Sequence, residues 1–174
     1  MKNIIPGLAA ALAIAAPLTA LAGTAIASDV FLARFDGEWS GSGHVQPNAE
    51  SSTHQVTCRT SGSSSPTALS VKGTCSAYMV FTRNVAVDVR LDPASGRYTG
   101  TYIGSPAGPA ALSGVRVGDT LKLDITWPKE INGDRSARLA ITSLGEGRFE
   151  LTLTDQLEPG GPRQATTRLS FAKS

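Results

Sequence analysis

The sequence predicts an all-β protein: an antiparallel up-and-down meander of about eight to ten strands, closed into a barrel, with a short N-terminal helix. Three observations predict this class. Apolar and polar residues alternate with a period of two over most of the chain after Gly37. Turn residues separate the alternating runs at short, regular intervals. The links between runs are too short to hold the crossover helix that parallel strands require.

The clearest strand runs from Thr120 to Trp127, where every second residue is apolar and the residues between are polar. This alternation is typical of a strand with one buried face. Other strands are predicted at Glu38–Val45, His54–Thr60, Ala68–Ser76, Val85–Leu91, Arg97–Ile103, Leu112–Arg116, Ser136–Thr142, Arg148–Asp155 and Gln164–Phe171, with a weaker one near Tyr78–Thr82.

Turn chemistry joins these runs as hairpins. Asn132-Gly133 precedes one strand, and Asn and Gly tolerate the positive φ angles of tight turns. Asp92-Pro93-Ala94-Ser95-Gly96 joins two others. The short links favour a barrel over a sandwich, since Greek-key sandwiches need some long connections.

The first 27 residues have the three parts of a secretory signal peptide. Lys2 supplies the positive start, an Ala-, Leu- and Ile-rich run follows, and Ala25-Ile26-Ala27 is a small-x-small cleavage pattern. A membrane anchor is disfavoured because Pro6 and Pro17 interrupt the run and no basic stop-transfer residues follow it. We therefore expect residues 1–27 to be cleaved and residues 28–174 to form one domain in the bacterial periplasm or outside the cell.

The segment after the expected cleavage site predicts a short helix over Val30–Phe35, with Ser28-Asp29 as its cap and Asp36-Gly37 as its end. The net charge of the whole chain is +2, and it is closer to neutral without Lys2. A near-neutral chain lacks the basic face that nucleic-acid binding requires, so no nucleic-acid partner is expected.

The two cysteines, Cys58 and Cys75, predict one structural disulfide, because thiols pair in an oxidising compartment. Cys58 shares parity with Val56, and Cys75 shares parity with Val71, so both lie on apolar strand faces. The bridge closes a loop of about seventeen residues, which stabilises the fold by about 3 kcal/mol. The Ser61–Pro66 stretch is expected to be the flexible loop between the two strands.

The segment Phe35-Asp36-Gly37-Glu38-Trp39-Ser40-Gly41-Ser42-Gly43 resembles the opening strand of the calycin barrels. Lipocalins share its G-x-W, and nitrobindin-like proteins also share its W-x-G-x-G glycines. The resemblance implies a lipocalin-like barrel whose closed end is plugged by Trp39. It also implies a basic residue on the last strand packed against this tryptophan, for which Arg168 is the candidate.

Two features depart from the family pattern. Arg168 has the opposite parity to Leu169, so simple alternation points it outward unless a bulge intervenes. The haem-ligating histidine of nitrobindin-like proteins lies near the C-terminus, and residues 164–174 contain no histidine, so no cofactor is expected. A bacterial metalloprotease-inhibitor barrel is also similar in outline.

No catalytic motif stands out, and the protein is not expected to be an enzyme. His44 and His54 are the only histidines, and a metal site would need both plus a third ligand such as Asp36 or Glu50. Surface positions are the simpler interpretation of both histidines, so no metal site is predicted. The chain lacks the hydrolase, P-loop and dinucleotide-binding signatures.

Aromatic residues supply the candidate site. Trp39, Tyr98, Tyr102 and Trp127 are predicted to face the barrel interior, where they either line a pocket or fill the core. The function expected first is binding of a small apolar or amphipathic ligand in the barrel. The alternative is a protein-interaction module of the cell envelope with a solid core, acting through a surface loop or through Ser28–Phe35.

Overall fold

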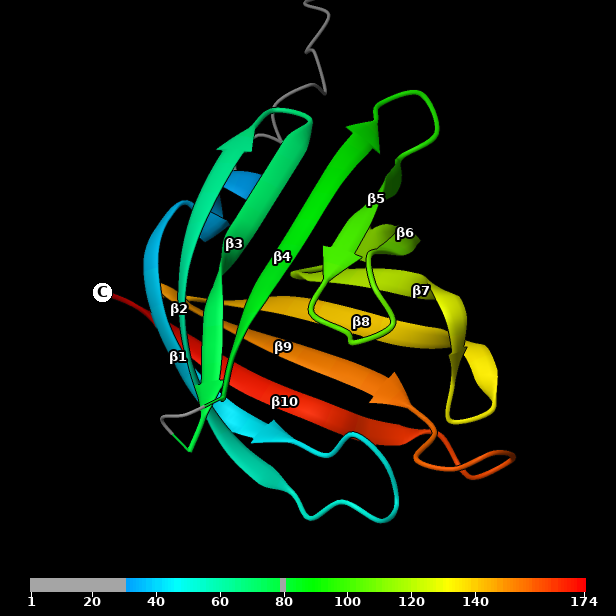
Figure 1. The fold of residues 1–174 in the computed structure, drawn as a ribbon. Coiled ribbons are helices and arrows are strands. Elements are labelled where there is room, and N and C mark those ends of the chain that lie inside the picture. The colour runs from blue at the N-terminus through cyan, green and yellow to red at the C-terminus, as the bar shows by residue number, and fades with distance from the viewer. Residues whose placement is uncertain (1–30, 79–80) are drawn as a thin grey trace, which may run out of the picture.

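The computed structural model describes residues 31–78 and 81–174, which form ten antiparallel strands (Figure 1). The strands are β1 (Gly37–Val45), β2 (His54–Ser65), β3 (Ala68–Ala77), β4 (Phe81–Asp92), β5 (Arg97–Ile103), β6 (Ala110–Val117), β7 (Thr120–Ile131), β8 (Asp134–Gly145), β9 (Arg148–Asp155) and β10 (Gln164–Lys173).

Each strand pairs with its neighbours in the chain, and β1 also pairs with β10, which closes the barrel. Figure 1 shows this closure, with the red C-terminal strand beside the blue-to-cyan first strand. The prediction of a closed, all-β, up-and-down meander is confirmed. Within the described residues, no helix has the length and apolar character needed to span a membrane.

In place of a regular helix over Val30–Phe35, the described chain has two helical residues, Phe31 and Leu32, followed by the 3-10 turn η1 (Ala33–Phe35). Asp36 is already extended and Gly37 has a φ of +110°, so the chain turns into β1 before a longer helix can form. The expected signal peptide, residues 1–27, and the proposed cap, Ser28-Asp29, lie outside the described residues.

Two segments that the sequence predicted to interrupt strands are part of strands in the structure. Residues 61–65, expected to be a flexible loop, continue β2 and pair with β3 through Ser65 opposite Ala68. The weak strand near Tyr78–Thr82 and the strand at Val85–Leu91 form one strand, β4, that starts at Phe81. Small or polar residues mask the alternation at both places, but the backbone pairing is continuous.

Inward-facing glycines mark the places where neighbouring strands approach most closely. A side chain at Gly100 in β5 would overlap the carbonyl oxygen of Asp88 in β4, and one at Gly114 in β6 would overlap that of Lys122 in β7. Glycine therefore permits the sharp coiling that closes the sheet.

We predict that Gly100→Ala lowers the free energy of unfolding by about 3 kcal/mol or more, because the new methyl group meets rigid backbone. Urea denaturation measures this change. Thr99→Ala, on the exposed outer face of the same strand, is the control and should cost less than about 1 kcal/mol. Equal effects of the two substitutions would contradict this account of the glycine.

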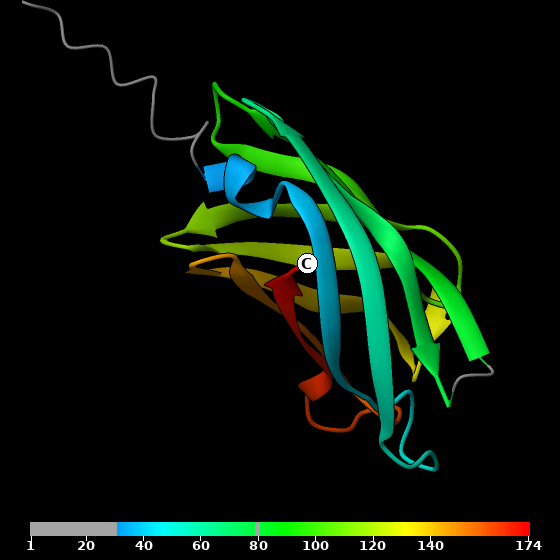
Figure 2. The ribbon, with the colours of Figure 1, turned by 90° about the vertical axis from the view of Figure 1, so that its left-hand side faces the viewer.

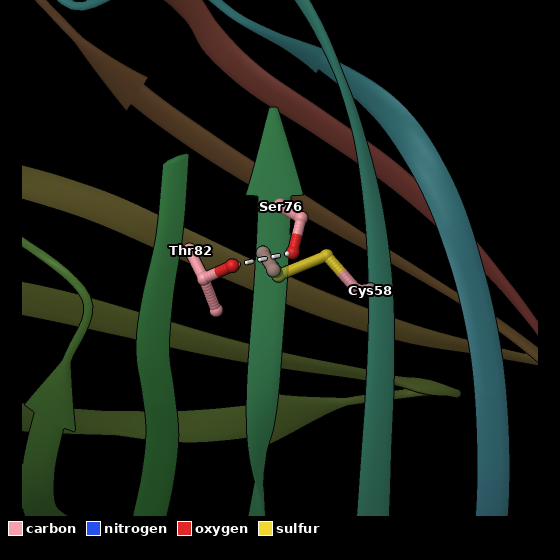
Figure 3. The surroundings of a disulfide bond; sticks show 4 residues. Cys58, Ser76 and Thr82 are labelled. Atoms are coloured by element: carbon pink, nitrogen blue, oxygen red, sulfur yellow. Dashed lines mark hydrogen bonds between the residues drawn. A yellow bond between two sulfur atoms is a disulfide. The ribbon is translucent and has the colours of Figure 1, made fainter. Parts of the chain in front are cut away.

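The disulfide between Cys58 and Cys75 is confirmed. The two residues lie directly opposite each other on β2 and β3, and Cys58 is buried in the core. Figure 3 shows the bridge beside the hydroxyl pair of Ser76 and Thr82, whose side chains join β3 to β4. The bond fixes the first hairpins on the inner face of the barrel.

The double variant Cys58→Ala/Cys75→Ala should unfold with about 3 kcal/mol less free energy, because the unfolded chain regains the entropy of a 17-residue loop. Chemical denaturation with and without a thiol reductant checks this. The reductant should destabilise the native protein and leave the double variant unchanged. A variant as stable as the oxidised protein would refute the stabilising role.

Candidate functional site: the open end of the barrel

The meander gives the barrel two unlike ends. One end holds η1, the C-terminus and the links β2–β3, β4–β5, β6–β7 and β8–β9. The other end holds the links β1–β2, β3–β4, β5–β6, β7–β8 and β9–β10. Figure 2 shows η1 in blue at the first of these ends, where the β2–β3 hairpin also turns.

Aromatic side chains seal the first end, which we call the closed end. Trp39 is 2% exposed, and its indole Nε1 donates a hydrogen bond to the carbonyl oxygen of Phe35 at 2.9 Å. Its ring lies edge-on to Phe149 at 4.8 Å, and Phe149 stacks on Phe171 at 4.4 Å. Phe31 and Phe35 are fully buried beside them.

Lys173, rather than Arg168, provides the cation beside Trp39. Its Nζ lies 5.7 Å from the centre of the indole ring, and the two residues are paired across β1 and β10. Arg168 is exposed on the outer face, opposite His44. The parity argument against Arg168 is therefore the correct one, and Lys173 shares the inward parity of Phe171.

Tyr98 also belongs to the closed half of the barrel. It is 2% exposed and pairs with Leu91 and Gly114. Burial raises the pKa of the Tyr98 hydroxyl, and the positive charge of Arg116 opposes this rise. The guanidinium of Arg116 lies 4.0 Å from the ring centre of Phe31. Because Tyr98 is buried, it fills the core of the closed end and does not line an accessible site.

Inward-facing side chains remain partly exposed at the second end, which we call the open end. Half-buried positions on its inner face include Val45 of β1, Cys75 and Ala77 of β3, Val85 of β4, and Tyr102 of β5. Core side chains at the closed end are almost completely buried by comparison. Solvent thus reaches the inner face of β1, β3, β4 and β5 at this end, whereas Ala110, Trp127 and Ala137 on β6, β7 and β8 are buried.

Tyr102 and Trp127 form an aromatic pair at the open end, with ring centres 6.0 Å apart in an edge-on arrangement. The Tyr102 hydroxyl lies over Gly104, where a Cβ atom would collide with it. The tyrosine therefore leans along β5 toward the β5–β6 link. Burial raises the pKa of Tyr102 to about 12, with the positive charge of Arg83 opposing the rise, so the phenol is protonated at neutral pH.

Asp155 is a buried carboxylate at the end of β9, held by two hydrogen-bond donors and one ion pair. The indole Nε1 of Trp127 donates to Oδ2 at 3.2 Å, and the Gln156 backbone N–H donates to Oδ1 at 2.8 Å. Arg163 lies 3.7 Å from Oδ1 and also pairs with Asp134. Burial raises the pKa of Asp155 and exceeds the opposing effect of these donors.

Side-chain bonds tie three of the open-end links together. Asn132 in the β7–β8 link donates its amide hydrogens to the carbonyl oxygens of Pro47 and Gln156, each at 2.9 Å. Gln156 donates back to the Asn132 carbonyl at 2.5 Å. This network fixes the side of the opening formed by β1, β7 and β9, and it holds Trp127 and Asp155 in place.

The histidines do not meet. His44 is exposed on the outer face, while His54 is at the rim of the opening, where its Nδ1 lies 3.0 Å from the Tyr78 hydroxyl. Across residues 31–78 and 81–174, no three His, Cys, Asp or Glu side chains are grouped as a metal site would require.

Two clefts mark the outer surface of the barrel. One of about 470 Å³ crosses β2 to β5 and is lined by polar residues that include Ser70, Asp88 and Thr101. The other, of about 580 Å³, lies at the closed end between Arg34 and Arg148. Neither is lined by the aromatic pair of the open end.

The four sequence candidates therefore divide into two pairs. Tyr102 and Trp127 meet at the open end, whereas Trp39 and Tyr98 are part of the sealed half. Arg83 and Asp155 were missed. Both carry the inward parity of their strands. Arg83 fell in the gap between the predicted strands Tyr78–Thr82 and Val85–Leu91, and Asp155 was included in the strand Arg148–Asp155 without a role.

The fold is similar to that of solved structures. The crystal structure of Rv2717c from M. tuberculosis superposes with a TM-score of 0.64 at 13% sequence identity, covering 87% of this chain and 98% of that one. EF1p2_mFAP2b bound to DFHBI matches with a TM-score of 0.37 and 15% identity over 81% of this chain and 94% of that one, too distant to support an argument. The first match shows that the two chains share a fold.

No protein-family model matches the sequence, and no curated protein matches it.

The raised pKa of Asp155 predicts a pH-dependent stability. A carboxyl whose pKa is higher in the folded state stabilises the fold at low pH, and this contribution is lost as the pH rises from about 4 through the folded pKa. We expect the unfolding free energy of the native protein to fall relative to that of Asp155→Asn across this range. Urea titrations at several pH values measure the difference.

Asp124→Asn removes an exposed carboxylate from the outer face of β7 and is the matched control. A difference between Asp155→Asn and the native protein that does not change with pH would refute the burial effect at Asp155.

Proposed function

We propose that this protein is an exported barrel that binds a small, largely apolar ligand through its open end. The observation that carries the proposal is the contrast between the ends: inner side chains are sealed around Trp39 and half-exposed around Tyr102. Ligand sites are mostly apolar recesses with a few placed polar groups. Tyr102 offers a half-exposed ring that packs edge-on against the buried ring of Trp127, and Gly104 keeps room for the tyrosine hydroxyl.

Export is part of the proposal and rests on the signal-peptide pattern of residues 1–27 together with the disulfide. Structural disulfides persist in oxidising compartments such as the periplasm and the extracellular space. The Cys58–Cys75 bridge on the inner face is consistent with such a location.

The competing role as a protein-interaction module acting through its N-terminal segment receives less support. Phe31, Leu32 and Phe35 have no exposed surface, because they form part of the closed end. Tyr78 and Phe81, which are 64% and 73% exposed, are instead beside the opening. These two aromatics favour a role at the entrance to the site.

Binding of N-phenyl-1-naphthylamine, a neutral apolar dye that fluoresces in dry surroundings, tests the proposal. We expect the purified protein to bind it, and Ala77→Phe to weaken binding tenfold or more, because position 77 is half-buried on the inner face at the opening. Ala111→Phe adds the same ring to the exposed outer face of β6 and should leave the affinity unchanged.

A fluorescence titration gives the dissociation constants. No binding to the native protein, or equal affinities for the native protein and Ala77→Phe, would overturn the proposal.

A further inference from the structure

Arg83 lies on the inner face of β4 at the open end. It is directly opposite Cys75 in the pairing of β3 with β4, and directly opposed residues face the same side of a sheet. Figure 3 shows Ser76 and Thr82, the neighbours of Cys75 and Arg83, joined to each other beside the disulfide. Since side chains alternate along a strand, Arg83 shares the inner face with the disulfide.

The Arg83 guanidinium has no carboxylate partner in residues 31–78 and 81–174. Its charge nevertheless reaches the Tyr102 hydroxyl, whose pKa it lowers against the effect of burial. The Arg83 side chain is exposed at the opening, so its charge is solvated. A guanidinium without an internal carboxylate partner can pair with an anion from outside without first breaking an ion pair.

The Tyr102 hydroxyl is a second polar group at the open end without a partner in the described residues. It leans toward the open end over Gly104, and it makes no hydrogen bond with any residue in the part of the chain described. A protonated phenol is a donor, so it can add a second hydrogen bond to an anion that Arg83 attracts. Asp155 does not compete for this position, since Trp127, Gln156 and Arg163 already engage it.

We propose that the ligand of the open end is an amphipathic anion, whose acid group is held by the Arg83 guanidinium and the Tyr102 hydroxyl and whose apolar part packs on the half-buried inner-face side chains of β3 and β4. This inference rests on the proposed function and adds the chemical class of the ligand. Arginine binds carboxylate and sulfonate-like oxygens through a planar fork of N–H donors, a geometry that lysine does not reproduce.

Two dyes with the same apolar body separate this inference from the proposed function. 1-Anilinonaphthalene-8-sulfonate carries one sulfonate, and N-phenyl-1-naphthylamine is the same molecule without it. We expect the native protein to bind the sulfonate tenfold or more tightly than the neutral dye. Arg83→Gln should abolish this preference by weakening only the sulfonate, and Arg83→Lys should restore part of it.

Tyr102→Phe keeps the ring contact with Trp127 and should weaken the sulfonate several-fold, with little effect on the neutral dye. Arg90→Gln is the matched control, because Arg90 is exposed on the outer face of the same strand. It should change neither affinity. Retained binding of the neutral dye also shows that each variant is folded.

Fluorescence titrations at fixed ionic strength decide between the outcomes. If both dyes bind the native protein equally, or if Arg83→Gln and Arg90→Gln have the same effect, the anionic class is overturned and the proposed function stands. If neither dye binds, the proposed function fails and the inference fails with it.

Discussion

Aromatic packing around Trp39 is the interaction on which the rest of the structure depends. The indole hydrogen bond to Phe35 ties the chain before β1 to the first strand, and the stack of Phe149 on Phe171 ties β9 to β10. Gly41 makes this possible, because a side chain there would occupy the ring of Phe171. Each buried aromatic contributes about 1.5–3 kcal/mol of hydrophobic stabilisation.

Because side chains seal the closed end, the proposed ligand would enter the barrel along its axis at the open end. The inner face at that end carries both aromatic and charged side chains. Tyr102 and Trp127 form an aromatic pair, and Arg83 adds a positive charge. The Asn132 hydrogen bonds fix the side of the opening that carries Asp155. An apolar interior bordered by a placed cation and a phenol is suited to a molecule with one apolar and one acidic part.

Most of the fold could be predicted from the sequence, because alternation and turn residues are local signals. The run from Leu121 to Trp127 and the Asn132-Gly133 turn were sufficient to place β7 and the following hairpin. The disulfide followed from the parity of Cys58 and Cys75. The Ser-rich end of β2 could not be predicted, since its strand character comes from pairing with β3 rather than from its own residues.

The site was harder to predict because its geometry joins residues that are far apart in the chain. Parity alone placed Tyr98 and Tyr102 on one face, but only the barrel shows that one is sealed and the other half-exposed. Lys173 was missed because the predicted last strand stopped at Phe171. Strand ends depend on cross-strand partners, and these were not visible in the local pattern.

The central claim is that ligands enter one end of the barrel only. The chain has two tryptophans, Trp39 at the closed end and Trp127 at the open end, so their indole N–H signals report on the two ends separately. A ¹H–¹⁵N correlation spectrum recorded during titration with N-phenyl-1-naphthylamine is the most direct test. The account predicts that the Trp127 signal shifts and the Trp39 signal stays in place. A shift confined to Trp39, or saturable binding that moves neither signal, would contradict it.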